Sequence, residues 1–192
     1  MIPIVMHVLK KVFNRKRIIR QFDSSWSRLH RIARSWGCDD DLACDLVQET
    51  CVIALDKAEQ LRKPESAECW LITILANCHR EHLRKAKRTL AIADETILHS
   101  EQSPDTALEQ THISEMVQQA IRCLSDDHRS VLTLVDMEGF SYTEVAEMLD
   151  IRIGTVMSRL SRARSRLRIL LNDSLLERTT DAAGLKGQIR RI

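Results

Sequence analysis

Apolar residues recur every three or four positions along most of the 192-residue chain, which is the spacing of amphipathic helices. Only 5 Gly and 3 Pro residues interrupt this pattern. Three helices are expected in the first half: one that ends at Gly37, one that Asp39 caps, and one from about Ser66 to Arg88. The pattern therefore predicts an all-α fold and a first helical module over residues 21–88.

Each of these helices has one apolar face that can pack against the other two. A module of this size buries only about 60% of its unfolded surface, so we expect contacts with partners to stabilise it. The positions expected to be buried are Trp26, Leu29, Ile32, Ala33 and Trp36, then Leu42, Leu46, Thr50, Ile53 and Ala54, then Leu71, Ile74, Leu75 and Cys78.

A second module of four shorter helices is expected over residues 113–171. Asp126 can cap its second helix, and Ser141 with Glu144 matches the capping box that starts its third. After a turn, a fourth helix is expected from about Thr155 to Leu171. A short helix, a tight turn and a longer basic helix together predict a helix-turn-helix, so the fold class is two small helical modules joined by a linker.

Residues 89–112 lack sustained periodicity and contain Ser103-Pro104, so we expect a flexible acidic linker. Residues 1–20 are apolar and then basic. They favour a frayed tail, with a short amphipathic helix that touches a membrane or a partner as the alternative. Residues 172–192 are expected to form a C-terminal tail.

The formal net charge of +2 conceals a segregated charge pattern. No Lys or Arg occurs between Thr89 and Ile121, whereas basic residues crowd before and after this stretch. Two basic patches divided by an acidic segment indicate a polyanion bound at two places. The last helix of the second module buries Val156, Leu160, Ala163 and Leu167, so its opposite face presents hydroxyl and guanidinium groups that suit DNA bases and phosphates. These are Thr155, Ser158, Arg159, Arg162 and Arg166.

The six cysteines form no CxxC pair and fall mostly within helical patterns, so we expect reduced, buried thiols. Cys78, His79 and His82 share a helix face, but no fourth ligand accompanies them. Neither a nucleophile with its base nor a glycine-rich phosphate loop occurs. The sequence therefore predicts no metal, no cofactor and no enzymatic activity. We expect a cytoplasmic protein without stable membrane insertion, because no apolar run approaches the roughly 20 residues that span a bilayer.

Three motifs carry a resemblance to a known family. Residues 141–168, SYTEVAEMLDIRIGTVMSRLSRARSRLR, are similar to region four of the extracytoplasmic-function sigma factors of bacterial RNA polymerase. Residues 45–50, DLVQET, resemble the core of region two in the same family. Residues 70–85, which begin Trp-Leu and include Asn77, resemble its next conserved stretch. The three motifs occur in the order that the family has.

The resemblance implies a transcription initiation factor that binds core RNA polymerase and promoter DNA, both as duplex and as melted single strand. It also implies an anti-sigma partner. By this resemblance the polymerase-binding residues are Asp45, Leu46, Gln48 and Glu49. The residues for the melted minus-ten element are Asn77, Arg80, Arg84, Lys85 and Arg88. Those for the duplex minus-thirty-five element are Thr155, Ser158, Arg159, Arg162 and Arg166.

The chain departs from the family pattern where Thr73 and Ala76 replace commonly basic residues and where Asp150 replaces a turn glycine. Arg62 and Lys63 are therefore alternative minus-ten contacts. An ordinary helix-turn-helix regulator that acts without polymerase docking is the alternative function, but it leaves DLVQET unexplained. The sequence does not identify the promoter, the controlled genes, the activating signal or the anti-sigma protein.

Overall fold

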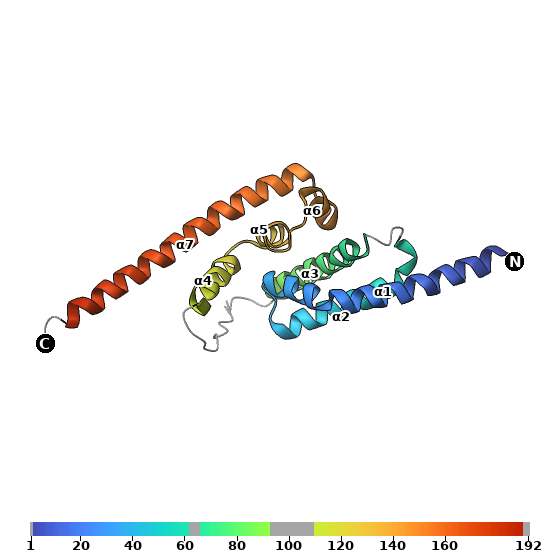
Figure 1. Cartoon of the computed structure of the whole chain (residues 1–192), viewed down its shortest axis with the longest axis horizontal. Coiled ribbons are helices and arrows are strands. Elements are labelled where there is room, and N and C mark those ends of the chain that lie inside the picture. Colours follow the sequence, from blue (N-terminus) through green and yellow to red (C-terminus); the bar gives the residue numbers. More distant parts are fainter. Residues whose placement is uncertain (1, 62–65, 93–109, 190–192) are drawn as a thin grey trace.

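The computed structural model describes residues 2–61, 66–92 and 110–189, with side chains over 14–61, 66–89 and 116–172. Every regular element in these ranges is helical, which confirms the all-α prediction. The helices form two groups, which we call the first and second modules (Figure 1). The first module holds α1 (Ile2–Ser35), α2 (Asp40–Asp56), a 3-10 turn (Ala58–Gln60) and α3 (Ala67–Ile92). The second holds α4 (Gln110–Arg122), α5 (Asp126–Leu132), a π-helical turn (Thr133–Met137), α6 (Tyr142–Leu149) and α7 (Ile153–Ile189).

Local signals start and end these helices mostly as predicted. Gly37 follows α1 with φ +97°, a conformation that favours glycine. The Asp39 carboxylate accepts the Leu42 N–H at 2.8 Å and so caps α2. The capping box predicted for α6 is also present. The expected cap at Asp126 is wrong, because Ser125 occupies the N-cap position and Asp126 lies in the first turn, where its charge still suits the helix dipole.

Both outer helices are longer than expected. α1 begins at Ile2 and is helical where a frayed tail was favoured. Ile18 is buried in the core, and Asn14 donates a hydrogen bond to the Ala58 carbonyl at 2.9 Å, so this part of α1 packs within the first module. α7 likewise continues to Ile189. The central part of the expected linker, residues 93–109, lies outside the described residues, as does the loop with Arg62 and Lys63.

One hydrophobic core runs through both modules. Trp36 at the end of α1 is buried and stacks on His79 of α3, with ring centroids 5.2 Å apart. α3 packs against α6, and α1 packs against both α4 and the π-helical turn. The two modules are therefore docked on each other, and this module interface determines what the functional residues face.

Candidate functional site

The expected polymerase-binding surface lies on α2. Asp45, Gln48 and Glu49 are exposed on one side of the helix, and Val52 beside them is 68% exposed. Leu46 faces the opposite way: it is 3% exposed and belongs to the core. The surface that a partner can touch in this structure therefore consists of three polar side chains and Val52, while Leu46 holds the helix in place from inside.

The five residues expected to hold melted DNA are all exposed, from the middle of α3 toward its end. Several of them already have protein partners. Arg80 donates to Asn77 Oδ1 at 3.0 Å and to the main-chain oxygen of Leu149, in the second module, at 3.2 Å. Arg84 donates two hydrogen bonds of 2.8 Å to Glu81, and this pairing lowers the pKa of the Glu81 carboxyl. Arg88 lies 3.8 Å from the same carboxylate.

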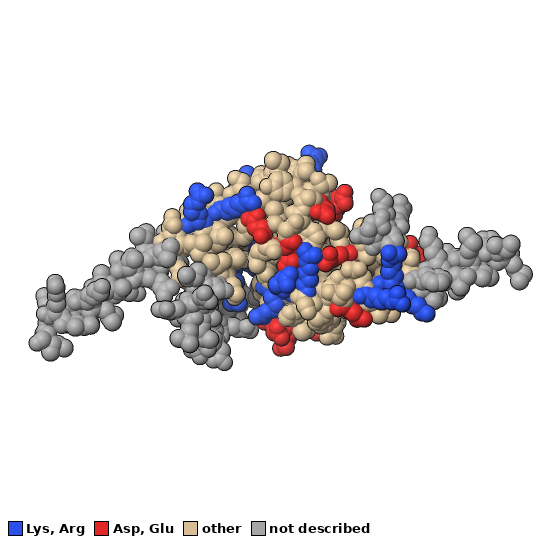
Figure 2. Space-filling view, in the orientation of Figure 1, with Lys and Arg blue, Asp and Glu red and all other residues tan. Residues whose placement is uncertain are grey.

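The expected duplex-reading residues lie on the first turns of α7. Val156, Leu160 and Ala163 are buried as predicted, and Leu167 is half-buried. This places Ser158, Arg162 and Arg166 in solvent, whereas Thr155 and Arg159 are partly covered. Basic side chains gather along α7 in the space-filling view (Figure 2).

Two arginines of α7 are paired with carboxylates of α5 and of the π-helical turn. Arg159 Nη2 lies 2.6 Å from Asp127 Oδ2, and Arg164 donates to both oxygens of Asp136, at 2.9 and 2.6 Å. No acidic residue lies between Arg152 and Arg168 in the sequence, so the pairing of these arginines with Asp127 and Asp136 could not be predicted from it. Figure 2 shows acidic and basic side chains close together across the middle of the molecule.

Glu138 forms the most buried ion-pair site of the module interface. Its side chain, 2% exposed, accepts hydrogen bonds from Arg28 at 2.8 Å and from Arg31 at 2.9 Å. Burial alone would raise the pKa of the Glu138 carboxyl, but the bonds from Arg31 and Arg28 outweigh it and hold the pKa below its usual range. Arg28 also lies 4.5 Å above the ring centroid of Phe140.

Arg129 forms a second connection between the modules. Its Nη1 donates to the main-chain oxygen of Trp36 at 2.6 Å, and its other nitrogens donate to the carbonyls of Ile121, Arg122 and Leu124. A Cβ atom on Gly37 would collide with this guanidinium. Gly37 is therefore required twice, for its positive φ and for the approach of Arg129.

A cavity of about 770 Å³ lies between the modules and brings the two expected DNA-binding sets together. Asn77, Arg80 and Arg84 line it from α3, and Arg159 lines it from α7. The cavity also contains carboxylates, among them Asp127. Neither set of DNA-binding residues is fully free in this arrangement.

The cysteine and histidine group that the sequence raised is not assembled. Among the described side chains, Cys78, His79 and His82 do not place three ligand atoms within reach of one ion. His79 is buried, and desolvation lowers its pKa to about 4. Burial also raises the pKa of the Cys38 thiol to about 11, so this thiol is not a ready nucleophile. Within the described ranges, every helix is too short or too polar to cross a bilayer.

Comparison with known proteins supports the assignment of both modules. The family description for sigma-70 region 2 matches residues 22–89, and that for sigma-70 region 4 matches residues 114–167. The sigma factor EcfG of Rhodopseudomonas palustris is 35% identical over 143 residues, covering 74% of this chain and 78% of the relative. The sigma factor SigM of Mycobacterium tuberculosis is 34% identical over 144 residues, covering 75% of this chain and 71% of the relative.

A solved structure shows the same arrangement of helices. The sigma factor RpoE of Bartonella quintana, in complex with the anti-sigma factor NepR, matches with a TM-score of 0.69 and 31% identity. The match covers 80% of this chain and 95% of that one. The chain therefore belongs to the extracytoplasmic-function family of bacterial RNA polymerase sigma factors, as the three sequence motifs predicted.

Proposed function

We propose that this sigma factor docks on core RNA polymerase through α2 and catalyses no reaction itself. The observation that carries the proposal is the exposed face formed by Asp45, Gln48, Glu49 and Val52 on a helix whose other side is packed in the core. A large, exposed apolar side chain among polar ones is typical of a protein-binding surface. An ordinary helix-turn-helix regulator has no use for this surface. Since core polymerase and promoters lie in the bacterial cytoplasm, the protein acts there.

The promoter is contacted by both modules. Asn77, Arg80, Arg84, Lys85 and Arg88 follow one face of α3 and suit the phosphates and unstacked bases of a melted strand. The first turns of α7 enter the major groove, where Arg159 can pair with a guanine edge and Ser158 can serve several acceptors. Arg166 lies farther along α7 and contacts phosphates.

The docked arrangement is a closed form that must open before duplex DNA binds. The cavity between the modules, about 770 Å³, has room for a small molecule but not for a DNA duplex. The start of α7 must instead enter a major groove that is roughly 12 Å wide. Arg80 is held by the Leu149 carbonyl and Arg159 by Asp127, so both must be released. Glu138, Arg129 and the shared core supply the free energy that keeps the modules together.

An anti-sigma protein is the partner that stabilises this closed form. RpoE of Bartonella quintana was solved with such a protein, and its fold matches this chain over both modules. A smaller groove of about 320 Å³ between the modules is lined by Arg31, Arg34, Arg122 and the half-exposed Met137. Cationic and apolar side chains together suit an acidic amphipathic helix.

The polymerase assignment is tested by reversing the polarity of α2. The double variant Gln48→Lys, Glu49→Lys should bind core polymerase at least about tenfold more weakly and lose run-off transcription on genomic fragments, with unchanged helical content. The control carries Gln119→Lys and Glu147→Lys, which alter charge equally at exposed positions of the second module. Undiminished binding of the α2 variant would contradict the proposal.

A further inference from the structure

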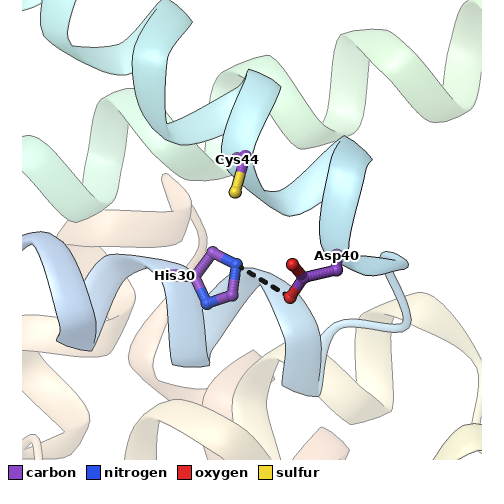
Figure 3. Close-up of side chains that lie close together, drawn as sticks. All are labelled: His30, Asp40 and Cys44. Carbon is purple, nitrogen blue, oxygen red and sulfur yellow. Dashed lines mark ion pairs between the residues drawn. The ribbon is translucent and has the colours of Figure 1, made fainter.

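Three potential metal ligands meet where α1 and α2 lie side by side. Asp40 and Cys44 are one helical turn apart and so share a face of α2. His30 approaches them from α1, and the ligand atoms of the three residues all lie within 4.8 Å of one another. Figure 3 shows the three groups in a triangle, with the Cys44 sulfur above the His30 imidazole and the Asp40 carboxylate beside it. The sequence did not suggest this group, because nothing in a helical repeat indicates that position 30 lies against positions 40 and 44.

The distance between His30 and Asp40 fits two ligands of one metal ion better than it fits a hydrogen bond. Nε2 of His30 lies 3.3 Å from Oδ1 of Asp40, yet this buried nitrogen has no hydrogen-bond partner among the described residues. Two such ligands on one tetrahedral zinc ion stand about 3.4 Å apart, given Zn–N and Zn–O lengths near 2.1 Å. His30 Nε2 is within ion-pair distance of Asp40 but makes no hydrogen bond, which is costly for a buried nitrogen, and a cation between the two atoms would satisfy it.

The sulfur needs only a small movement to complete the set. A thiolate and an imidazole on one zinc ion stand about 3.6 Å apart, and Cys44 Sγ is already within 4.8 Å of both other ligand atoms. Cys44 and His30 are half-buried and Asp40 is exposed, so an ion can enter from solvent and retain water as its fourth ligand.

The charges around the group are mixed but favour a cation. Asp39 and Asp41 flank Asp40, and Asp45 follows Cys44. Arg34 opposes them, since its Nε lies 4.0 Å from Asp40 Oδ1. A divalent ion would displace this distant and partly exposed guanidinium at little cost.

We propose that His30, Asp40 and Cys44 form a binding site for a borderline transition-metal ion, of which Zn²⁺ is the best match to one nitrogen, one oxygen and one sulfur ligand. On binding, the Cys44 thiol loses its proton to solvent and the thiolate forms the metal–sulfur bond, while the ion keeps its oxidation state. The ion joins α1 to the first turns of α2. It therefore stiffens the helix that carries Asp45, Gln48 and Glu49.

The test uses the full chain, stripped of metal with a chelator and titrated with Co²⁺ as a spectroscopic substitute for Zn²⁺. We expect one ion per chain, a thiolate-to-cobalt charge-transfer band, and competition by Zn²⁺ that removes the band. Cys44→Ser should abolish the band, and His30→Gln and Asp40→Asn should each weaken binding at least about tenfold. Cys51→Ser, a half-buried cysteine on the same helix, is the matched control and should retain the band.

A second measurement does not depend on the sulfur band. Zn²⁺ should raise the Tm of the parent protein and of Cys51→Ser, but not that of His30→Gln. The proposal is overturned if the parent protein shows no charge-transfer band, or if Cys44→Ser keeps it. Equal binding by His30→Gln and the parent would also overturn it, because a cysteine alone would then account for the metal.

Discussion

Arg159 of the recognition helix is paired with Asp127 of α5 at 2.6 Å, and its side chain is only 25% exposed. The residue that we propose to read a base is thus held by a carboxylate in this structure. We therefore expect promoter binding to exchange Asp127 for a guanine edge.

Replacing Arg159 with Ala should cost about 1–3 kcal/mol in binding to the upstream promoter element and relax preference at one or two base pairs. Arg166→Ala should instead weaken all sequences alike and make the salt dependence shallower by roughly one phosphate contact. Binding to a library of upstream elements at two salt concentrations separates these effects. An unchanged sequence preference in Arg159→Ala would show that the recognition helix is oriented differently.

Asp127→Asn should strengthen binding to the same element, because it removes the carboxylate that competes for Arg159. An exposed ion pair is worth up to about 1 kcal/mol, which corresponds to at most about a fivefold gain in affinity. Asp136→Asn is the control, since Asp136 pairs with Arg164 instead. If Asp127→Asn bound no better than this control, the ion pair would not compete with DNA.

Glu138→Gln should shift the protein toward an open form. The substitution replaces the buried carboxylate by a neutral amide and weakens its charge-assisted hydrogen bonds. This costs about 1.5–3 kcal/mol, because both arginines remain partly exposed and Arg28 keeps its pair with Glu68. Small-angle X-ray scattering should report a larger radius of gyration. Asp136→Asn, which carries the same charge change within the second module, should leave the radius unchanged.

Ala76→Arg should open the modules by a different route. Ala76 is 5% exposed and lines the cavity with Arg80, Arg84 and Arg159, so an arginine there would add a poorly solvated positive charge beside like charges while the modules are docked. The variant restores a basic residue that the family commonly has at this position, so single-stranded DNA binding should rise as compaction falls. Ala86→Arg, at an exposed position of α3, is the control. Unchanged scattering from Ala76→Arg would contradict the packing role of this alanine.

Stability should fall in acid partly through His79. Its pKa is about 4 in the folded protein and about 6.5 when unfolded, so the neutral ring is favoured by folding. The free energy of unfolding therefore falls by about 3 kcal/mol through His79 as the pH drops from 6.5 to 4, and His79 causes no such loss above pH 6.5. His79→Phe keeps a ring against Trp36 and should show a shallower decline in the free energy of unfolding between pH 6.5 and 4. A decline as steep as that of the parent would assign the acid sensitivity to other groups.

Asp150→Gly should stabilise the turn between α6 and α7. Asp150 has φ +52°, a left-handed conformation that costs a non-glycine residue about 1 kcal/mol. Asp150→Ala removes the same charge but keeps a Cβ, and it should not stabilise. Chemical denaturation of both variants measures the difference; equal stability of the two would remove backbone strain as the explanation.

Features set by neighbouring residues could be predicted from the sequence. The capping box of Ser141 and Glu144, the turn at Gly37 and the buried face of α7 all depend on contacts within one or two helical turns. The three motifs likewise identified the family, because each is a continuous stretch.

Contacts across the module interface could not be predicted in the same way. Arg28 and Glu138 are 110 positions apart, and Arg129 and Trp36 are 93 apart. Periodicity shows which face of a helix is buried but not which helix covers it. For this reason the sequence places Leu46 both in the core and on the docking surface. Its burial in the structure assigns it to the core.

In the closed form that we propose, the shared core of the two modules would also set how much transcription occurs without any signal. If only the open form binds a promoter, the apparent affinity falls in proportion to the open fraction, and every 1.4 kcal/mol of closing free energy changes that fraction about tenfold. Residues such as Glu138 and Ala76 can therefore change the basal output of all target genes together while the promoter preference stays the same. Variation at these positions would alter the level of transcription without altering which genes are transcribed.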